Sequence, residues 1–386
     1  MSEILSSYLL VILLAILGIS LLVHLLFYLI PYTYILRRKR RERLNIVEKT
    51  DEKPPVSVII CAKNEGENLL RFLPLVLEQQ YPEYEVILVN DGSWDNTEKI
   101  INDFKKEYNN LYITNIPTET KIISHKKLAI TVGVKAAKHE HLLFIDADCR
   151  PLTPHWITNM VANFTDKKEF ILGFGNYYRN KGILGSIINY DTLLIAMQYM
   201  GFAALDVPYM GVGRNMAYRR STFFNRKGFA GFLHVASGDD DLLVNAAGNK
   251  ENTALEPQLG AITISLPETS FKEWFFQKHR HLSTGKLYNT KSKVLLMIEP
   301  LFKALFFASI IALIVVGYSN IIVISTVVGA LTIKYLVQYI VINATSRTYN
   351  QKGFGLSLIL CDIFLPLIAI YICTVGKLLI KKRGWK

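Results

Sequence analysis

The stretch HLLFIDAD at residues 141–148 joins a short apolar run to two closely spaced aspartates, and it decides the fold of the middle of the chain. Two similar runs precede it, VSVIICA at 56–62 and EVILVND at 85–91. Such short runs, rich in β-branched residues, are typical of buried strands. Segments with helical spacing of apolar residues separate them. Strands alternating with helices predict an α/β fold in which neighbouring strands are parallel.

Acidic residues follow the ends of these predicted strands, namely Glu65, Asp91, Asp146 and Asp148. The carboxyl ends of parallel strands meet at one edge of the sheet, which is where ligands bind. A single acid after a strand is usually a helix cap or a turn former. Several carboxylates on one edge repel each other unless a cation or a ligand neutralises them. Hard oxygen ligands at Asp146 and Asp148 suit Mg²⁺ or Mn²⁺ shared with phosphate oxygens.

Two further segments carry polar residues in patterns that indicate a site. In GDDDLLVNAAG at 238–248, three consecutive aspartates stand at the expected start of a helix. One acidic residue there would already interact favourably with the helix dipole, so three suggest an additional role. In FKEWFFQKHRHLSTG at 271–285, Gln277, Arg280 and His281 have spacings of three and four residues. These three side chains would lie on one face of a helix, which suggests a shared ligand.

Composition and charge indicate a membrane protein. Of 386 residues 51% are hydrophobic, which excludes a disordered or fibrous chain. The net charge of +12 is concentrated in RRKRRER at 37–43 and KLLIKKRGWK at 377–386, each with five more basic than acidic residues. Both runs follow apolar stretches, so anionic lipid headgroups are the expected partner and nucleic acid is not. The four cysteines are widely spaced without a CxxC pair, which predicts a reducing compartment.

Residues 8–30 are long and apolar enough to form a transmembrane helix. The basic run behind it would stay in the cytoplasm together with the domain that follows. Three more apolar stretches, at about 301–318, 321–342 and 355–376, would leave the basic tail outside if all of them crossed. We therefore expect the last, interrupted by Asp362 and Pro366, to be a re-entrant hairpin. The stretch from Leu184 to Ala204 is expected to be an amphipathic helix lying on the membrane.

These observations divide the chain into a transmembrane helix, a basic linker, a cytoplasmic catalytic domain and a C-terminal membrane region, at residues 1–36, 37–53, 54–290 and 291–386. The middle part resembles the family 2 glycosyltransferases over about 54–290. The resemblance rests on seven motifs in the family's order: VSVIICAKNEGENL, VNDGSWDNT, SHKKLAITVG, FIDADCRP, GVGRNMAYRR, SGDDDLLVN and FFQKHRHLSTG. It implies an inverting enzyme of GT-A fold that uses a nucleotide-sugar donor.

For the donor side, the resemblance implies that Glu65 and Asp91 contact the base and ribose of the nucleotide. Lys126 would approach the donor, although a solvated lysine at a helix start is an equal alternative. Asp146 would face the ribose or the sugar. Asp148 would ligate a Mg²⁺ or Mn²⁺ ion that stabilises the departing diphosphate.

For the acceptor side, the resemblance implies a carboxylate base opposite the diphosphate. Asp239 stands where the family usually has glutamate, Asp240 is the expected base and Asp241 is the second choice. Asn215 matches a position lining the acceptor side.

Gln277 and Arg280 belong to the motif that places an arginine near the diphosphate. His281 replaces the motif's tryptophan, which argues against processive synthesis.

The resulting hypothesis is a multi-pass membrane glycosyltransferase that transfers a sugar to a lipid or lipid-linked glycan at the cytoplasmic leaflet. Its last two motifs are spaced as in enzymes similar to ceramide glucosyltransferases. Two alternatives stay open at this point. One is a processive polysaccharide synthase of the same family, and the other is an inactive membrane scaffold that only binds nucleotide.

Overall fold

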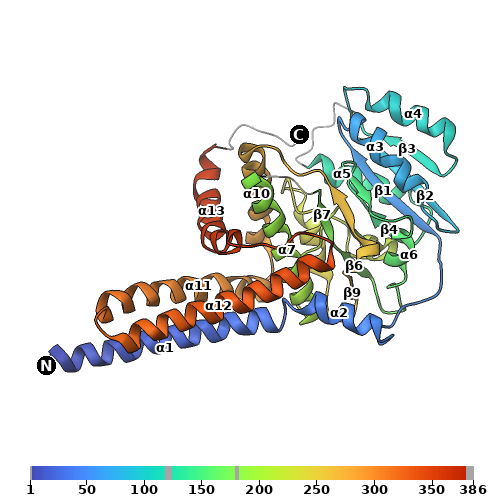
Figure 1. Cartoon of the computed structure of the whole chain (residues 1–386). Helices are drawn as coiled ribbons and strands as arrows, with labels where there is room; N and C mark the ends of the chain where they lie inside the picture. Colours follow the sequence, from blue (N-terminus) through green and yellow to red (C-terminus); the bar gives the residue numbers. More distant parts are fainter. Residues whose placement is uncertain (1, 118–123, 179–181, 380–386) are drawn as a thin grey trace.

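The computed structural model describes residues 2–117, 124–178 and 182–379. Figure 1 shows an α/β domain at one end and long helices that project from it side by side. The end of the predicted basic tail, 380–386, lies outside the described residues. All four cysteines lie inside them and are free thiols.

The main sheet has seven strands in the order β3-β2-β1-β4-β8-β6-β9. Their bounds are β1 Val56–Ala62, β2 Tyr84–Asn90, β3 Leu111–Asn115, β4 His141–Phe144, β6 Phe170–Gly173, β8 Met216–Arg219 and β9 Thr253–Glu256. The first four are parallel, as the repeated strand and helix pattern predicts. Strand β8 runs antiparallel to both β4 and β6, so the sheet is mixed.

A second sheet of three short strands adjoins the carboxyl end of β4. It consists of β5 Cys149–Pro151, β10 Thr263–Ser265 and β7 Gly175–Tyr177, with β10 in the middle. Because β5 begins directly after Asp148, this sheet holds the second aspartate of the DAD sequence in place.

Helices cover both faces of the main sheet. Successive side chains of β1 point to opposite faces, and they are apolar on both. Val58 and Ile60 belong to the apolar cluster formed with α3, α4 and α6, while Ile59 belongs to the cluster on the other face with α5. The helices of the domain are α3 Gly66–Leu77, α4 Thr97–Glu107, α5 His125–Ala136, α6 Trp156–Val161, α8 Arg220–Asn225, α9 Asp241–Ala247 and α10 Phe271–Thr284, with the short turns η1 Ala230–Phe232, η2 Leu259–Ala261 and η3 Gly285–Leu287.

Helix α7, Gly182–Ala204, is an interior helix, so the prediction of a helix lying on the membrane is wrong. It packs against α2, α12 and α13 on one side and against β7 and β9 on the other. Tyr190, Met197 and Phe202 are among its many buried residues. A helix that is apolar on all sides is stable when protein surrounds it, and the sequence pattern did not distinguish this from a membrane surface.

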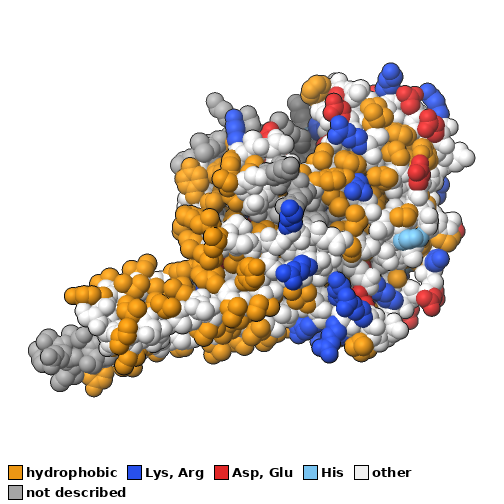
Figure 2. Space-filling model, in the orientation of Figure 1, with side chains coloured by type: hydrophobic (Ala, Val, Ile, Leu, Met, Phe, Trp, Pro, Cys, Tyr) orange, Lys and Arg blue, Asp and Glu red, His pale blue; other side chains and the backbone are white. Residues whose placement is uncertain are grey.

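Four helices are long and apolar enough to cross a membrane. They are α1 Ser2–Leu29, which continues through α2 Tyr34–Arg43 in the candidate span, α11 Thr290–Gly317, α12 Ile321–Thr348 and α13 Ser357–Leu379. Figure 1 shows α1, α11 and α12 as one projecting bundle, and Figure 2 shows apolar side chains over its surface.

The last apolar stretch forms one continuous helix, α13, and the predicted re-entrant hairpin is therefore wrong. Pro366 lies inside this helix. Asp362 does not interrupt it either, because its carboxylate is paired with Lys303 of α11 and Lys334 of α12. A buried acid with such partners need not break a helix.

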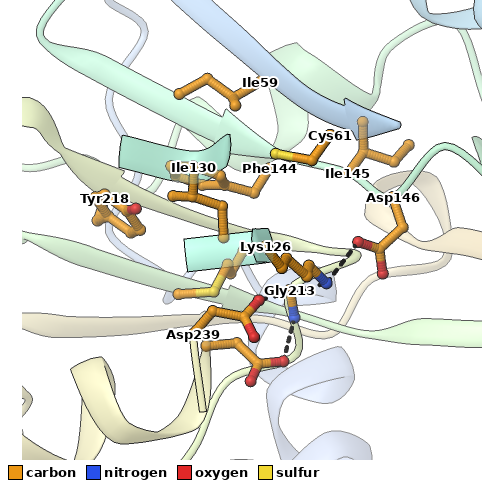
Figure 3. Close-up of a pocket in the computed structure, with 12 residues that line it drawn as sticks. Ile59, Cys61, Lys126, Ile130, Phe144, Ile145, Asp146, Gly213, Tyr218 and Asp239 are labelled. Carbon is orange, nitrogen blue, oxygen red and sulfur yellow. Dashed lines mark hydrogen bonds and ion pairs between the residues drawn. The ribbon is translucent and has the colours of Figure 1, made fainter. Parts of the chain in front are cut away.

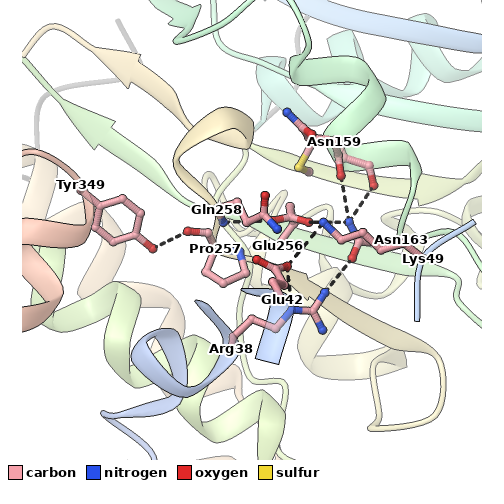
Figure 4. A network of polar contacts seen from close by, with 10 residues as sticks. Arg38, Glu42, Lys49, Asn159, Asn163, Glu256, Pro257, Gln258 and Tyr349 are labelled. Carbon is pink, nitrogen blue, oxygen red and sulfur yellow. Dashed lines mark hydrogen bonds and ion pairs between the residues drawn. The ribbon is translucent and has the colours of Figure 1, made fainter. Parts of the chain in front are cut away.

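The basic segment after α1 is docked on the domain, although a linker was predicted there. Glu256 has no exposed surface, and its carboxylate accepts hydrogen bonds from Lys49 at 2.6 Å and from the amide of Asn163 at 2.9 Å. The amide oxygen of Asn163 accepts a further hydrogen bond from Arg38 of α2 (Figure 4). Tyr349, just after α12, donates to the carbonyl of Pro257 at 2.9 Å. These contacts tie α2, the segment after it and the exit of α12 to the same edge of the sheet.

Candidate active site

A cavity of about 420 Å³ lies between the carboxyl end of β4, α7 and α10. Eight of the predicted site residues line it: Lys126, Asp146, Asp148, Asp240, Asp241, Gln277, Arg280 and His281. The remaining wall includes apolar side chains of α7 and α11, among them Ile188, Ile195 and Leu296. The cavity therefore joins an acidic edge of the sheet to helices that pack toward the membrane bundle.

Lys126 bridges the two acidic segments of the site. Its Nζ atom lies 3.0 Å from Asp146 Oδ1 and 3.3 Å from Asp239 Oδ2, and Figure 3 shows it pointing between them. Burial lowers the pKa of Lys126, but the charges of Asp146, Asp239 and Asp240 outweigh burial and raise the pKa well above its usual value. The same lysine holds the pKa of Asp146 below its usual value against the effect of burial. Lys126 is thus a fixed cation rather than a solvated lysine at a helix start.

Asp148 has few partners for a carboxylate in this position. Ser265 of β10 donates to its Oδ2 at 2.9 Å, and the Cys149 thiol donates to its Oδ1 at 3.2 Å. Burial and the charge of Asp146 raise the pKa of Asp148. Among the described residues, no positively charged side chain forms an ion pair with the ionised form of this acid.

The residues around Asp148 fit a hard divalent cation. Ligand atoms of Asp146, Asp148 and Cys149 all lie within 4.8 Å of one another. Burial raises the pKa of the Cys149 thiol well above its usual value, so it stays protonated and donates to Asp148. The available ligands are then carboxylate oxygens, which suit Mg²⁺ or Mn²⁺ better than a thiolate-binding metal.

Three consecutive aspartates at the start of α9 have different surroundings. Asp239 is buried next to Lys126 in a smaller cavity of about 20 Å³ that adjoins the main one. Asp240 lines both cavities, and it accepts hydrogen bonds from the backbone N–H groups of Gly213 at 2.7 Å and Asp241 at 2.8 Å. Burial, followed by the charges of Asp239 and Asp241, raises the pKa of Asp240 to about 7.

Asp241 is held by hydrogen bonds to its own neighbours. Its Oδ2 accepts from the hydroxyls of Thr284 and Tyr288, the latter at 2.6 Å, and its Oδ1 accepts from the N–H of Leu242 at 2.7 Å. Only 6% of its surface is exposed. Asp241 thus ties the start of α9 to the end of α10, and among the three acids Asp240 is the one with the most suitable environment for a base.

Helix α10 presents the predicted face to the cavity. Gln277, Arg280 and His281 all line it, and Gln277 donates to Glu268 at 3.3 Å. Trp274, one turn earlier, is 4% exposed and packs with Tyr177 and Ile188 in a small apolar cluster. Trp274 thus packs α10 against the rest of the domain, and it also forms part of the cavity wall.

Glu65 and Asp91 follow β1 and β2 as predicted but do not line the main cavity. Asp91 is 2% exposed and is paired with Lys63 at 3.3 Å and His125 at 3.0 Å. Glu65 accepts from Asn68 at 2.6 Å. Burial, followed by the charges of Asp148 and Asp146, raises the pKa of Glu65 to about 7. Glu65 therefore lies close enough to these two aspartates for their charges to act on it.

Asn215 does not line the acceptor side, and its prediction needs correction. The residue has no exposed surface. Its Oδ1 accepts from the indole of Trp156 at 2.9 Å, and its Nδ2 donates to the carbonyls of Phe174 at 2.8 Å and Ala261 at 2.9 Å. Both of its amide hydrogens and its carbonyl oxygen are engaged in these contacts, which explains an asparagine here without any ligand.

Two more basic side chains shape the site. The sequence leaves open whether Arg214 of the GVGRNMAYRR motif meets a phosphate or lipid headgroup or lies on the surface, and it does not single out Lys127. Arg214 lines the cavity, its guanidinium stacks on Tyr177 at 4.4 Å, and its buried Nε has no partner among the described residues. Lys127 is fully buried and donates to the carbonyls of Phe232, Val235 and Ser237, which hold the loop before Asp239. The neighbouring basic residues Lys126 and Lys127 look alike in sequence, and only their orientation on α5 separates their roles.

The fold and this arrangement define a class of protein. Over 96% of this chain and 100% of the other, the structure is similar to the mannosyltransferase PcManGT from Pyrobaculum calidifontis in complex with GDP-Man and Mn²⁺, with a TM-score of 0.58. At 14% sequence identity this likeness shows the fold, which is the predicted GT-A type. Residues 57–224 match the model of glycosyl transferase family 2. The predicted resemblance to this family is therefore confirmed over residues 57–224, which are less than half of the chain.

Curated relatives support the same class. Poly-beta-1,6-N-acetyl-D-glucosamine synthase of Staphylococcus epidermidis is 32% identical over 118 residues, 30% of this chain and 27% of that protein. Glycosyltransferase AglE of Haloferax volcanii is 38% identical over 126 residues, 32% of this chain and 40% of that protein. The match thus spans less than half the length of either relative.

Proposed function

We propose that this chain is a membrane-bound inverting glycosyltransferase that transfers a sugar from a nucleotide-diphosphate sugar to a hydroxyl of a lipid or lipid-linked glycan. The observation that carries the proposal is the composition of the main cavity. Acids from the ends of β4 and the start of α9 meet the cationic face of α10 there, next to apolar side chains of α7 and α11. Such a cavity suits a charged donor and an acceptor that arrives from the membrane.

The donor would be held at the edge formed by β4, β5 and β10. Asp148, oriented by Ser265, would hold a Mg²⁺ or Mn²⁺ ion, which when bound stabilises negative charge on a departing diphosphate. Arg280 and Arg214 line the same cavity and offer guanidinium donors to phosphate oxygens. The nucleotide and Mn²⁺ of the similar mannosyltransferase structure are consistent with this assignment.

Asp240 is the proposed general base. Its carboxylate faces the main cavity, and a pKa of about 7 places it near the pH at which a base works efficiently. Asp240 takes the proton from the acceptor hydroxyl as that oxygen bonds to the anomeric carbon. The N–H groups of Gly213 and Asp241 fix the carboxylate while the proton moves.

The apolar helices support a multi-pass protein in the cell membrane, with the catalytic domain in the cytoplasm. The basic residues of α2 follow α1 directly, and basic segments of this kind remain on the cytoplasmic side. The docking of α2 and Tyr349 on the domain would keep the cavity close to the inner leaflet.

The test uses the full chain in detergent with Mn²⁺ or Mg²⁺, a panel of labelled nucleotide-sugars and extracted membrane lipids. We expect a labelled glycolipid from the wild type and none from Asp240→Asn, which should still bind the donor. Asp148→Ala should lose metal-dependent donor binding. Glycolipid formation by Asp240→Asn would disprove the base, and donor binding without any transfer would indicate an inactive scaffold.

A processive polysaccharide synthase is the second candidate, because a relative named as a polysaccharide synthase matches the catalytic segment. The same assay separates the two functions by product size. A single-sugar product in organic extract supports transfer to a lipid, whereas labelled material that grows in length with time supports polymer synthesis.

A further inference from the structure

Helix α13 has two different apolar faces. The face formed by Leu358, Cys361 and Ile372 is buried, with exposures of 1 to 5%. The opposite face carries large apolar side chains that are more than half exposed: Leu360 at 56%, Phe364 at 53%, Leu367 at 56%, Ile370 at 62% and Tyr371 at 53%. We call these five residues the α13 stripe. Its spacing of three and four residues places it along one side of the helix.

The buried face of α13 packs on the catalytic domain. Its main helix partners are α10 and α7, and Figure 1 shows it running crosswise to the bundle of α1, α11 and α12. Leu365 and Ile368 pack against the cluster that contains Trp274 of α10. The ring of Tyr371 lies 5.9 Å from that of Phe275. Helix α13 is therefore attached to the helix that carries Gln277, Arg280 and His281.

The position of Asp362 gives the depth of α13 relative to the bundle. Lys303 pairs with Asp362 at 2.7 Å, and Lys334 pairs with its other oxygen. Lys303 lies fourteen residues before Gly317, the end of α11, which corresponds to about 21 Å of helix. The hydrocarbon core is about 30 Å thick. If the turn after Gly317 reaches the far headgroups, Asp362 lies about 10 Å below the near surface, a depth that suits a helix in the interface.

We propose that α13 is not a fourth membrane span but an interfacial helix, which lies in the leaflet next to the catalytic domain with its stripe among the acyl chains. The stripe is continuous with the apolar surface of the projecting bundle, and a lipid contact is the one that fits both (Figure 2). The chain then crosses the membrane three times, through α1, α11 and α12. Two crossings separate the basic residues of α2 from the basic tail, so both lie on the cytoplasmic side, as the positive-inside rule requires.

Label depth in liposomes tests this arrangement. One cysteine at a time replaces Leu360, Phe364, Leu367 or Ile370 in a full-length background with Cys61→Ser and Cys373→Ser, in which the remaining native cysteines are buried. Spin labels on the introduced cysteines are exposed to oxygen and to a water-soluble nickel chelate. We expect all four labels to report similar, shallow depths. A spanning helix would change depth by about 15 Å over these ten residues.

Helix α12 provides the matched control. Labels at the exposed positions Ile322, Val328 and Ile333 should differ in depth by about 16 Å, which also shows that the variants are folded and inserted. A gradient in α13 as steep as in α12 would overturn the proposal. So would labels shielded from both reagents, because a second copy of the chain would then cover the stripe.

A reporter fused to the C-terminus of the unsubstituted chain gives an independent reading. We expect the reporter on the side of the catalytic domain, and a reporter on the opposite side would contradict three crossings. Neither measurement depends on sugar transfer. Failure of this proposal would therefore leave the proposed reaction untouched, and failure of the reaction would leave the proposed position of α13 untouched.

Discussion

Two groups of buried charges in this protein differ in how well they are balanced. At the junction of α11, α12 and α13, the acids Glu299 and Asp362 meet Lys303 and Lys334, with ion-pair distances of up to 4.0 Å. Around the main cavity and the small one beside it, Lys126 contacts Asp146 and Asp239. Asp148 and Asp240 have no ion pair in the part of the chain that the structure describes, although Arg214, Lys278 and Arg280 also line the main cavity.

This difference in pairing distinguishes charged residues that stabilise the fold from charged residues that can bind a ligand. Opposite charges in equal number satisfy each other, and removing one partner leaves the other buried and unpaired. Burial, followed by the charges of neighbouring carboxylates, raises the pKa of Asp148 and Asp240, which favours binding of a cation or a proton. Buried ionised groups by themselves therefore do not indicate a ligand-binding site, whereas buried carboxylates without ion-pair partners do.

The largest expected effect is on the unbalanced group. Asp240→Asn should lower kcat by about 10²- to 10⁴-fold, the usual contribution of a general base. Its unfolding midpoint should not fall, because the substitution removes one of several mutually repelling acids. Transfer rates and thermal unfolding of the purified protein measure both. Asp103→Asn, on the exposed surface of α4, is the control, and a loss of less than tenfold in Asp240→Asn would contradict the assignment.

The balanced group should respond in the opposite way. Asp362→Asn leaves Lys334 without a counter-charge and Lys303 with only Glu299, at 4.0 Å, and should cost about 3 to 5 kcal/mol of unfolding free energy. Denaturant unfolding in detergent measures the loss. The double variant Lys334→Met, Asp362→Leu removes both charges of this ion pair and should recover part of the lost unfolding free energy. A variant Asp362→Asn as stable as the wild type but inactive would show that this group belongs to the site after all.

A smaller effect is expected where the orientation of one acid is changed. Ser265→Ala removes the hydroxyl that donates to Asp148 Oδ2 and should weaken metal-dependent donor binding by about 10- to 100-fold. Calorimetric titration of donor at several Mn²⁺ concentrations measures this change. Ser283→Ala, on the exposed end of α10, serves as the matched control. Equal donor affinity in both variants would argue against Asp148 as the metal ligand.

The pH dependence of transfer should reflect the excess of acids in the cavity. Asp240 acts as a base only when ionised, and its pKa is raised to about 7. We expect kcat/KM to rise with pH up to about 7 and to fall about tenfold for each pH unit below it. A profile measured from pH 5 to 8 tests this expectation, and activity that stays flat down to pH 5 would not fit Asp240 as the base.

The smallest effect concerns the acid that has its own partners. Tyr288→Phe removes one of the two hydroxyls that donate to Asp241 and should cost about 1 to 2 kcal/mol of stability. Tyr112→Phe, on an exposed position of β3, should cost nothing measurable. Loss of activity in Tyr288→Phe without loss of stability would instead point to Asp241 as the reacting acid.

Much of the fold could be predicted because its signals are local. The parallel strands β1 to β4, the DAD sequence at the end of β4 and the active face of α10 all follow from spacing within short segments. The errors concern segments whose surroundings come from distant parts of the chain. Helix α7 is apolar on every side, and its sequence does not distinguish a protein interior from a membrane surface.

The sequence by itself determined the elements, the family motifs and the segments that are apolar enough to enter a membrane, because periodicity and composition act over a few turns or strands. The tertiary structure decided that Asp240 and Asp241 line the main cavity while two hydroxyls donate to the carboxylate of Asp241, that Asn215 is buried in hydrogen bonds to three residues, and that Asp362 is neutralised by two lysines. These outcomes depend on burial and on charges brought together from residues far apart in the chain. Both are properties of the packed molecule that no single segment contains.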